Sequence, residues 1–274
     1  MPHLPQEIVD YIIDILHDNP EVLKRCCLVS KSWIPRPQTH LFNHVEFKDP
    51  EHLSVWRKIF PNPEDSPAVY TRSLCFHNAE NIAEGDVNWV RSFTRVERLE
   101  VLVHHHEQRP RSRGFFVPFH NLSSTVKSLS VGWSVLPLQQ VFDFICSFPL
   151  LEDLHVVGLG RDIDGAIFWS ARLPVLTGTL VLESAAADFV RQLLELPDSL
   201  CFRKVVWRLG IGNEVEWRLG IGHDPEWMRD LVGRCSETLE FIDIHCRTST
   251  ESFLFVPPAT GSVTDGIYIS GRSS

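Results

Sequence analysis

Basic residues are scarce in this chain. Its 274 residues include 26 lysines and arginines against 35 aspartates and glutamates, which gives a formal net charge of -9. A protein that binds the phosphate backbone of nucleic acids needs a dense positive field. The charge balance therefore argues against nucleic acid as a partner. The length allows either one large domain or a small module joined to a larger domain.

Long uninterrupted apolar runs are also missing. No segment approaches the roughly 18 apolar residues that are needed to cross a bilayer, and the first residues lack the features of a secretory signal. We therefore expect no membrane partner and a cytoplasmic or nuclear location. The 7 cysteines are scattered and include no C-x-x-C pair, so we expect reduced thiols rather than disulfides or a zinc site.

Several motifs of catalytic and phosphate-binding sites are absent as well. The chain contains no G-x-G-x-x-G, G-K-S/T, G-x-S-x-G or H-E-x-x-H motif. His104, His105 and His106, with His120 further on, suggest a metal site at first sight. Adjacent residues of a strand point to alternate faces, however, so we expect these side chains not to converge on one ion. We therefore expect no enzymatic activity, no cofactor and no metal site.

The first 45 residues are the most informative part of the chain. Pro5 is typical of a helix start, and the stretch from Ile8 to Leu16 is apolar around more of its circumference than a single core contact needs. A second helix is predicted after Asn19-Pro20, and a third short segment begins at Trp33. Three short helices enclose little core, so we expect them to need a partner or the rest of the chain.

The same segment resembles an F-box. The similarity rests on Leu4-Pro5-x-Glu7-Ile8, on Ile12 and Leu16, and on Leu23-x-x-Cys26-x-x-Val29-Ser30-Lys31-x-Trp33. The resemblance implies docking onto the Skp-type adaptor of a cullin–RING ubiquitin ligase, and Trp33 matches an internal core position of the box. The docking positions of the family fall on Leu4, Pro5, Ile8 and Ile12. The alternative is an ordinary three-helix start to a larger core.

From about residue 70 a short strand pattern recurs along the chain. The fourth residues of the successive segments are separated by 25, 30, 25, 26, 25 and 37 residues. A period near 25 with one strand each is typical of a leucine-rich solenoid, whereas the alternative, a doubly wound α/β enzyme, needs a glycine-rich turn that is absent. The predicted strands are 71–76, 96–101, 126–131, 151–156, 177–182, 202–207 and 239–244. Helices are expected between them, over 86–93, 138–148, 185–196 and 226–236.

The outlying step of 37 residues coincides with a tandem duplication. The sequence WRLGIGNEVE (207–216) is followed by WRLGIGHDPE (217–226). We interpret it as an insertion in a surface loop, where additional length costs little closure entropy. A tryptophan-containing binding hairpin is the alternative. One copy should extend the strand, and the other should form a loop or ribbon before Asp224.

Candidate substrate-binding residues lie on the strands and in one basic loop. Strand residues between the core positions should point to the face opposite the core. The arginines of the loop can bind an acidic or phosphorylated peptide. The alternative is a loop that is simply solvated. The candidates are Glu100, Asp153 and His155 on the strands, and Arg109, Arg111 and Arg113 in the connection 102–124.

Together these observations predict an α+β or α/β protein with an F-box-like helical module over 1–45, a linker over 46–69, an irregular leucine-rich-repeat-like α/β solenoid over 70–256 and a tail over 257–274. The segments Cys235–Glu240 and Ser147–Leu154 resemble many-copy fungal F-box families. The resemblance implies a substrate-recognition adaptor of a Skp–cullin–F-box ubiquitin ligase, whose solenoid binds an unknown protein substrate. The alternative is a leucine-rich-type protein-binding scaffold with no ubiquitin-ligase role.

Overall fold

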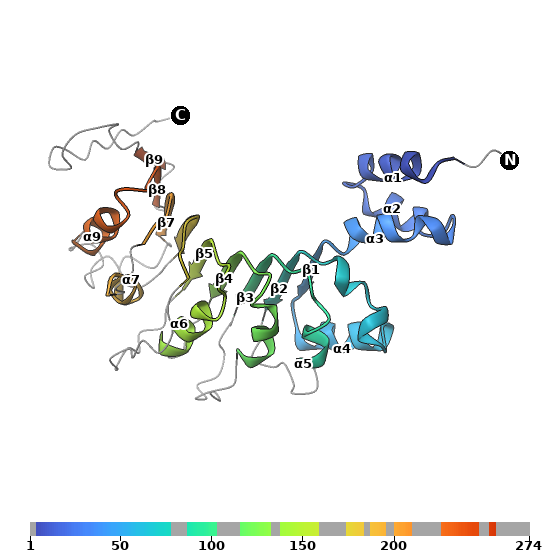
Figure 1. Cartoon of the computed structure of the whole chain (residues 1–274), viewed down its shortest axis with the longest axis horizontal. Helices are drawn as coiled ribbons and strands as arrows, with labels where there is room; N and C mark the ends of the chain where they lie inside the picture. Colours follow the sequence, from blue (N-terminus) through green and yellow to red (C-terminus); the bar gives the residue numbers. More distant parts are fainter. Residues whose placement is uncertain are drawn as a thin grey trace. The chain divides into compact units, whose positions relative to one another are not determined.

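The structure is a computed structural model (Figure 1). It describes residues 4–77, 87–102, 116–132, 138–158, 174–183, 187–195, 200–209, 226–246 and 252–255. The chain divides into two compact units, of which the first comprises 1–101 and 115–126 and the second comprises 102–114 and 127–274. Both units combine helices with parallel strands, so the expected α/β class is confirmed.

Three short helices and a 3₁₀ turn begin the first unit. They are α1 (Gln6–Ile15), α2 (Pro20–Cys26), η1 (Lys31–Trp33) and α3 (Pro35–Leu41). The side chain of Asn19 accepts a hydrogen bond from the backbone N–H of Val22, and Pro20 occupies the first turn, so α2 starts where the sequence predicts. Ser30 caps η1 in the same way, through the backbone N–H of Ser32.

The core of this helical segment is small. Its buried members are Val9, Ile13, Leu23 and Cys26. Around them pack the partly buried side chains of Leu16, Val22, Trp33 and Leu41. Trp33, which we expected to be an internal residue, thus packs against this core while staying partly exposed. A core of this size agrees with the expectation that three short helices need additional contacts.

The stretch 46–69, which we expected to be a linker, is folded. It runs from the end of β1 (His44–Phe47) through α4 (Pro50–Ile59), η2 (Pro63–Asp65) and η3 (Pro67–Tyr70). Strand β1 pairs in parallel with β2 (Ser73–His77). The ring of Phe47 in β1 stacks on that of Phe76 in β2, with 5.0 Å between the ring centroids. The same ring lies edge-on to Trp56 of α4, with 5.8 Å between the centroids. The linker prediction is wrong because these aromatic contacts join a four-residue strand and a helix to the core.

The remaining elements continue the alternation of helices and strands. They are α5 (Val87–Val90), β3 (Arg98–Leu102), η6 (Val117–Leu122), β4 (Ser128–Gly132), α6 (Leu138–Cys146), β5 (Asp153–Val157), β6 (Thr179–Glu183), α7 (Ala187–Leu194), β7 (Lys204–Leu209), α9 (Glu226–Arg234), β8 (Phe241–Cys246) and β9 (Ser252–Phe255). The strand order follows the chain from β1 to β9. Strands β4 to β8 pair in parallel, and β9 is antiparallel to β8. In the second unit, α6, α7 and α9 follow one another along the same side of these strands (Figure 1).

Neighbouring strands of the second unit meet in the same register. Leu129 of β4 pairs with Leu154 of β5, which pairs with Leu180 of β6, and all three side chains are fully buried. The backbone hydrogen bonds at the start of the strands also follow a common pattern, as β5 shows. The carbonyl oxygen of Lys127 accepts hydrogen bonds from the N–H groups of both Glu152 and Asp153. The strands begin about two residues later than predicted, with their spacing unchanged.

Two predictions fall wholly or mainly outside the described residues. Of the duplicated segment, 207–209 belong to β7 and Glu226 begins α9, while 210–225 lie outside the described part. The predicted tail over 257–274 also lies outside it. The expected extension of the strand by the first copy is thus seen for its first three residues.

Two remaining observations concern the cysteine side chains and the length of the helices. Cys26, Cys27, Cys75, Cys146, Cys201 and Cys235 are free thiols. Among the helices that the structure describes, none is long and apolar enough to span a membrane.

Candidate functional sites

An exposed apolar stripe runs along α1. Ile8, Ile12 and Ile15 follow one another at spacings of four and three residues, which places them on one side of the helix. They are 46%, 42% and 63% exposed, and Leu4 and Tyr11 are 61% and 65% exposed. We call Leu4, Ile8, Tyr11, Ile12 and Ile15 the α1 stripe. An apolar surface of this kind is typical of an interaction site.

The α1 stripe is distinct from the face by which α1 joins its own core. Val9 and Ile13, one residue further along than Ile8 and Ile12, are only 2% and 0% exposed. The helix therefore has two apolar faces, and the fold of the chain covers one of them. The predicted docking residue Pro5 caps α1 and is exposed as well.

Four further exposed apolar residues were not identified from the sequence as docking positions. Tyr11 and Ile15 extend the stripe on α1, while Leu28 and Val29 follow α2 and are 85% and 63% exposed. Their apolar character alone could not identify them, because buried and exposed apolar residues alternate along these short helices.

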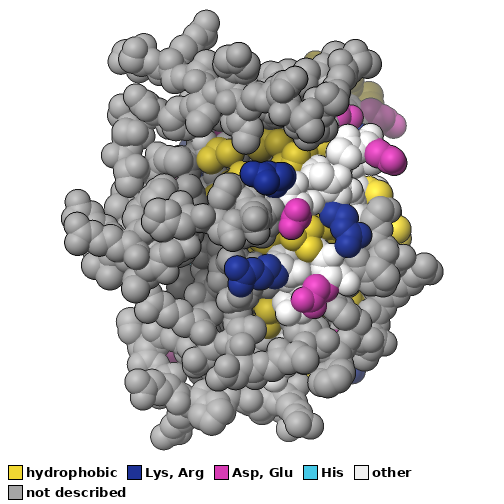
Figure 2. Space-filling view, turned by 90° about the vertical axis from the view of Figure 1, so that its left-hand side faces the viewer, with side chains coloured by type: hydrophobic (Ala, Val, Ile, Leu, Met, Phe, Trp, Pro, Cys, Tyr) yellow, Lys and Arg dark blue, Asp and Glu magenta, His cyan; other side chains and the backbone are white. Residues whose placement is uncertain are grey.

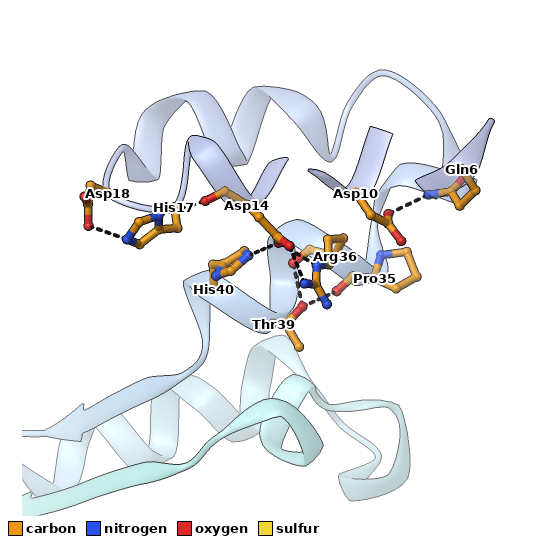
Figure 3. A network of polar contacts seen from close by, with 9 residues as sticks. All are labelled: Gln6, Asp10, Asp14, His17, Asp18, Pro35, Arg36, Thr39 and His40. Carbon is orange, nitrogen blue, oxygen red and sulfur yellow. Dashed lines mark hydrogen bonds and ion pairs between the residues drawn. The ribbon is translucent and has the colours of Figure 1, made fainter. Parts of the chain in front are cut away.

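The polar side of α1 is used inside the helical segment. The Asp14 carboxylate accepts hydrogen bonds from Nε and Nη2 of Arg36 in α3, at 2.6 and 2.5 Å (Figure 3). His40 Nε2, also in α3, lies 2.8 Å from Asp14 Oδ1. On the far end of the same side, the amide of Gln6 donates to Asp10 at 2.8 Å. Polar contacts thus fix α1 against α3 while the α1 stripe stays open to solvent.

The electrostatics of this network follow from its geometry. The hydrogen bonds from the Arg36 guanidinium lower the pKa of Asp14 to about 2, with a smaller contribution from His40 and an opposing one from burial. Asp14 in turn raises the pKa of Arg36. Both groups therefore stay charged at neutral pH and hold the two helices together.

A ladder of polar side chains crosses the strands of the second unit. Ser130 Oγ of β4 lies 3.2 Å from His155 Nδ1 of β5. His155 Nε2 lies 3.5 Å from Glu183 Oε2 of β6, and Nη1 of Arg208 of β7 donates to the same oxygen at 3.4 Å. Glu183 and Arg208 were missed from the sequence because the predicted strand windows end one residue too early.

Of the other predicted substrate-binding residues, Asp153 and Glu100 lie in the part of the chain that the structure describes. Asp153 lies on the same strand as His155, but its Oδ1 accepts the backbone N–H of Thr179 at 2.6 Å and so secures the entry into β6. Glu100 belongs to β3 in the first unit. The three arginines of the basic loop, Arg109, Arg111 and Arg113, lie outside the described residues.

A shallow depression of about 340 Å³ lies where β6, β7 and β8 begin. Its lining residues are Thr177, Cys201, Arg203, Glu237, Thr238, Leu239 and Glu240. The Ser130–His155–Glu183 ladder does not line it, so the serine and histidine do not face this space.

On the side that carries α7 and α9, basic and acidic side chains are interspersed over apolar surface (Figure 2). Mixed signs of charge are typical of a protein-binding surface as well as of an ordinary solvated one.

Comparisons with known proteins add no relative. No family model matches the chain. No curated protein and no solved structure matches it either.

Proposed function

We propose that the protein is a substrate-recognition adaptor of a Skp–cullin–F-box type ubiquitin ligase. Its N-terminal helical module acts as an F-box that docks the Skp-type adaptor. The region from residue 70 acts as an irregular leucine-rich-repeat-like solenoid that holds a protein substrate. The chain contributes proximity, and other subunits of the ligase carry out the chemistry.

The α1 stripe is the observation that carries the proposal. Three of the four positions that match the docking positions of the family, Leu4, Ile8 and Ile12, are exposed apolar residues on this stripe. A fully buried aliphatic side chain contributes about 1.5–3 kcal/mol relative to an exposed one. Covering the stripe with an apolar partner surface therefore provides a sizeable driving force for association.

The regular strands support the second half of the proposal. Parallel strands in chain order, with one strand every 25 to 30 residues over most of the sheet, are the arrangement that a leucine-rich solenoid requires. The described face opposite the buried leucines carries His155, which lies 3.2 Å from Ser130 and 3.5 Å from Glu183. A polar face of this kind suits the recognition of a folded or extended protein segment.

An adaptor pull-down from cell extract tests the proposal. The full chain should capture both the Skp-type adaptor and the cullin, whereas Ile8→Asp and Ile12→Asp should each reduce capture to background. Ile59→Asp on α4 is the matched control, because Ile59 is also exposed, at 62%, but lies on another helix. Its capture should equal that of the wild type.

The alternative, a protein-binding scaffold with no ligase role, predicts a different outcome. Under that alternative neither the adaptor nor the cullin is captured by the wild-type chain. Equal capture by the wild type and by both α1 variants would also reject docking through the α1 stripe.

A further inference from the structure

A cluster of metal-ligating side chains lies on β1 and β2, on elements that the docking surface does not use. Glu46 of β1 is directly opposite Cys75 of β2 in the parallel pairing. His77 is two residues further along β2 and so points to the same face as Cys75. His77 Nε2 lies 2.9 Å from Glu46 Oε1 and 3.4 Å from Cys75 Sγ.

The spacing of these atoms suits a single ion. One ligand atom from each of Glu46, Cys75 and His77 lies within 4.8 Å of the other two. Tetrahedral zinc binds such atoms at about 2.0–2.3 Å, which places its ligands roughly 3.3–3.8 Å from one another. Small side-chain movements therefore bring all three onto one ion. A thiolate, an imidazole and a carboxylate together favour a borderline-soft dication over calcium or magnesium.

A fourth group completes the surroundings. Glu100 of β3 lies close enough to the Cys75 thiol to influence its pKa. Burial, followed by the nearby Glu100 and Glu46 carboxylates, raises the pKa of the Cys75 thiol to about 12, so the metal–sulfur bond has to offset the cost of removing this proton. Lys48 Nζ lies 3.6 Å from Glu46 Oε2 and partly balances the acidic charge.

Access and charge balance also suit a dication. Cys75 is 4% exposed, whereas the side chains of Glu46 and His77 are 34% and 25% exposed, so an ion can enter from the solvent side. On binding, the metal–sulfur bond forms as the S–H bond of Cys75 breaks, and the proton leaves to solvent. The thiolate and the Glu46 carboxylate then neutralise the two positive charges of the ion.

We propose that Glu46, Cys75 and His77 bind a zinc-like divalent metal ion, with Glu100 or a water molecule as the fourth ligand. The ion links β1 to β2 at one end of the sheet and stabilises the folded state by binding to it preferentially. The sequence predicted no metal site because it offered no short-spaced cysteine pair. Here the third ligand comes from a neighbouring strand instead.

Cobalt titration of the full chain, after removal of bound metal with a chelator, tests the proposal. Co²⁺ reports directly on its ligands, because a bound thiolate produces a charge-transfer band in the near ultraviolet. We expect one equivalent of Co²⁺ to produce this band and Zn²⁺ to abolish it by displacement. Cys75→Ser should remove the band and weaken binding at least about 100-fold, and His77→Gln should weaken binding about 10–100-fold.

Cys146→Ser is the matched control. It removes a half-buried thiol on α6, and its titration should match that of the wild type. Circular dichroism shows whether each variant is folded. If Cys75→Ser fails to fold, His77→Gln decides, because His77 is partly exposed. A wild-type chain without the band, a band that persists in folded Cys75→Ser, or unchanged affinity in His77→Gln would overturn the metal site.

Discussion

Helix α1 and strand β5 use the residues outside their cores in opposite ways. Each element buries a regular set of apolar side chains, such as Ile13 in α1 and Leu154 in β5, both of which are 0% exposed. On β5 two of the residues that alternate with them are polar, Asp153 and His155, and His155 Nδ1 lies 3.2 Å from Ser130 Oγ of the preceding strand, β4. On α1 the neighbouring residue is Ile12, which is 42% exposed.

This difference separates a surface whose polar groups contact adjacent strands from an apolar surface that is exposed to solvent. The polar groups of Asp153 and His155 on β5 lie against groups of the adjacent strands β4 and β6. The α1 stripe has no such compensation, because exposed isoleucine gains only when it is removed from water. The comparison therefore points to the helical segment as the place of association.

The largest expected effect contrasts two adjacent residues of α1. Ile13→Ala should lower the free energy of opening of the helical segment by about 2–4 kcal/mol, because it leaves a cavity in a small core. Ile12→Ala should change it by less than about 0.5 kcal/mol, because Ile12 lies at the surface. Amide hydrogen exchange of α1 measures this local free energy. Equal losses in the two variants would show that Ile12 also belongs to the core.

A second contrast compares alanine substitutions at two glycines of the second unit, Gly178 and Gly233. A Cβ atom at Gly178 would lie 2.2 Å from Asp153 Oδ1 and 2.9 Å from the carbonyl oxygen of Glu152, whereas one at Gly233 would meet nothing within 4 Å. Gly178→Ala should therefore destabilise the second unit by about 1–3 kcal/mol in urea unfolding. Gly233→Ala, within α9, should stabilise it by up to about 1 kcal/mol. A neutral Gly178→Ala would mean that β5 and β6 separate more easily than their pairing indicates.

The smallest expected effect concerns pH and the contact between α1 and α3. The pKa of Asp14 is about 2 in the folded protein and 3.8 when unperturbed, so the unfolded state binds more protons between these values. The stabilisation of the folded state by ionised Asp14 is present above the unperturbed pKa of 3.8, and it is lost as the pH falls from about 4 to 2. Because the Asp14 side chain is 36% exposed, solvent screening limits the contribution of this ion pair to at most about 1 kcal/mol.

Hydrogen exchange of α1 between pH 6 and pH 2.5, corrected for the intrinsic exchange rates, measures this loss. Asp14→Asn should remove the additional loss at low pH. Asp10→Asn on the same helix is the control and should have a smaller effect, since Asp10 accepts a hydrogen bond from Gln6 and acts on Arg36 only through its charge. An unchanged pH dependence in Asp14→Asn would show that the ion pair with Arg36 does not contribute.

The sequence alone predicted the features that depend on periodic burial. The strand spacing was predictable because parallel strands bury side chains at the same position of every repeat, as Leu129 and Leu154 do. The α1 stripe followed from a helix that is apolar on more than one side. By contrast, β1 was not predicted, because a four-residue strand gains its place only through contacts such as Phe47 on Phe76.

Side-chain partners on neighbouring strands were the hardest features to predict. Asp153 carries the same charge whether it binds a substrate or, as here, the backbone N–H of Thr179. Glu46 meets Cys75 and His77 only because β1 and β2 pair in one particular register. Register depends on packing along the whole strand pair, which no local pattern contains.

A calorimetric titration of the full chain with purified Skp-type adaptor tests the central claim most directly. The wild type and Ile59→Asp should bind with the same affinity, and the double variant with Ile8→Asp and Ile12→Asp should bind at least about 100-fold more weakly, which corresponds to about 2.7 kcal/mol. Circular dichroism spectra of the three proteins should coincide. A wild-type chain that does not bind the adaptor, or a folded double variant that binds as tightly as the wild type, would contradict docking through the α1 stripe.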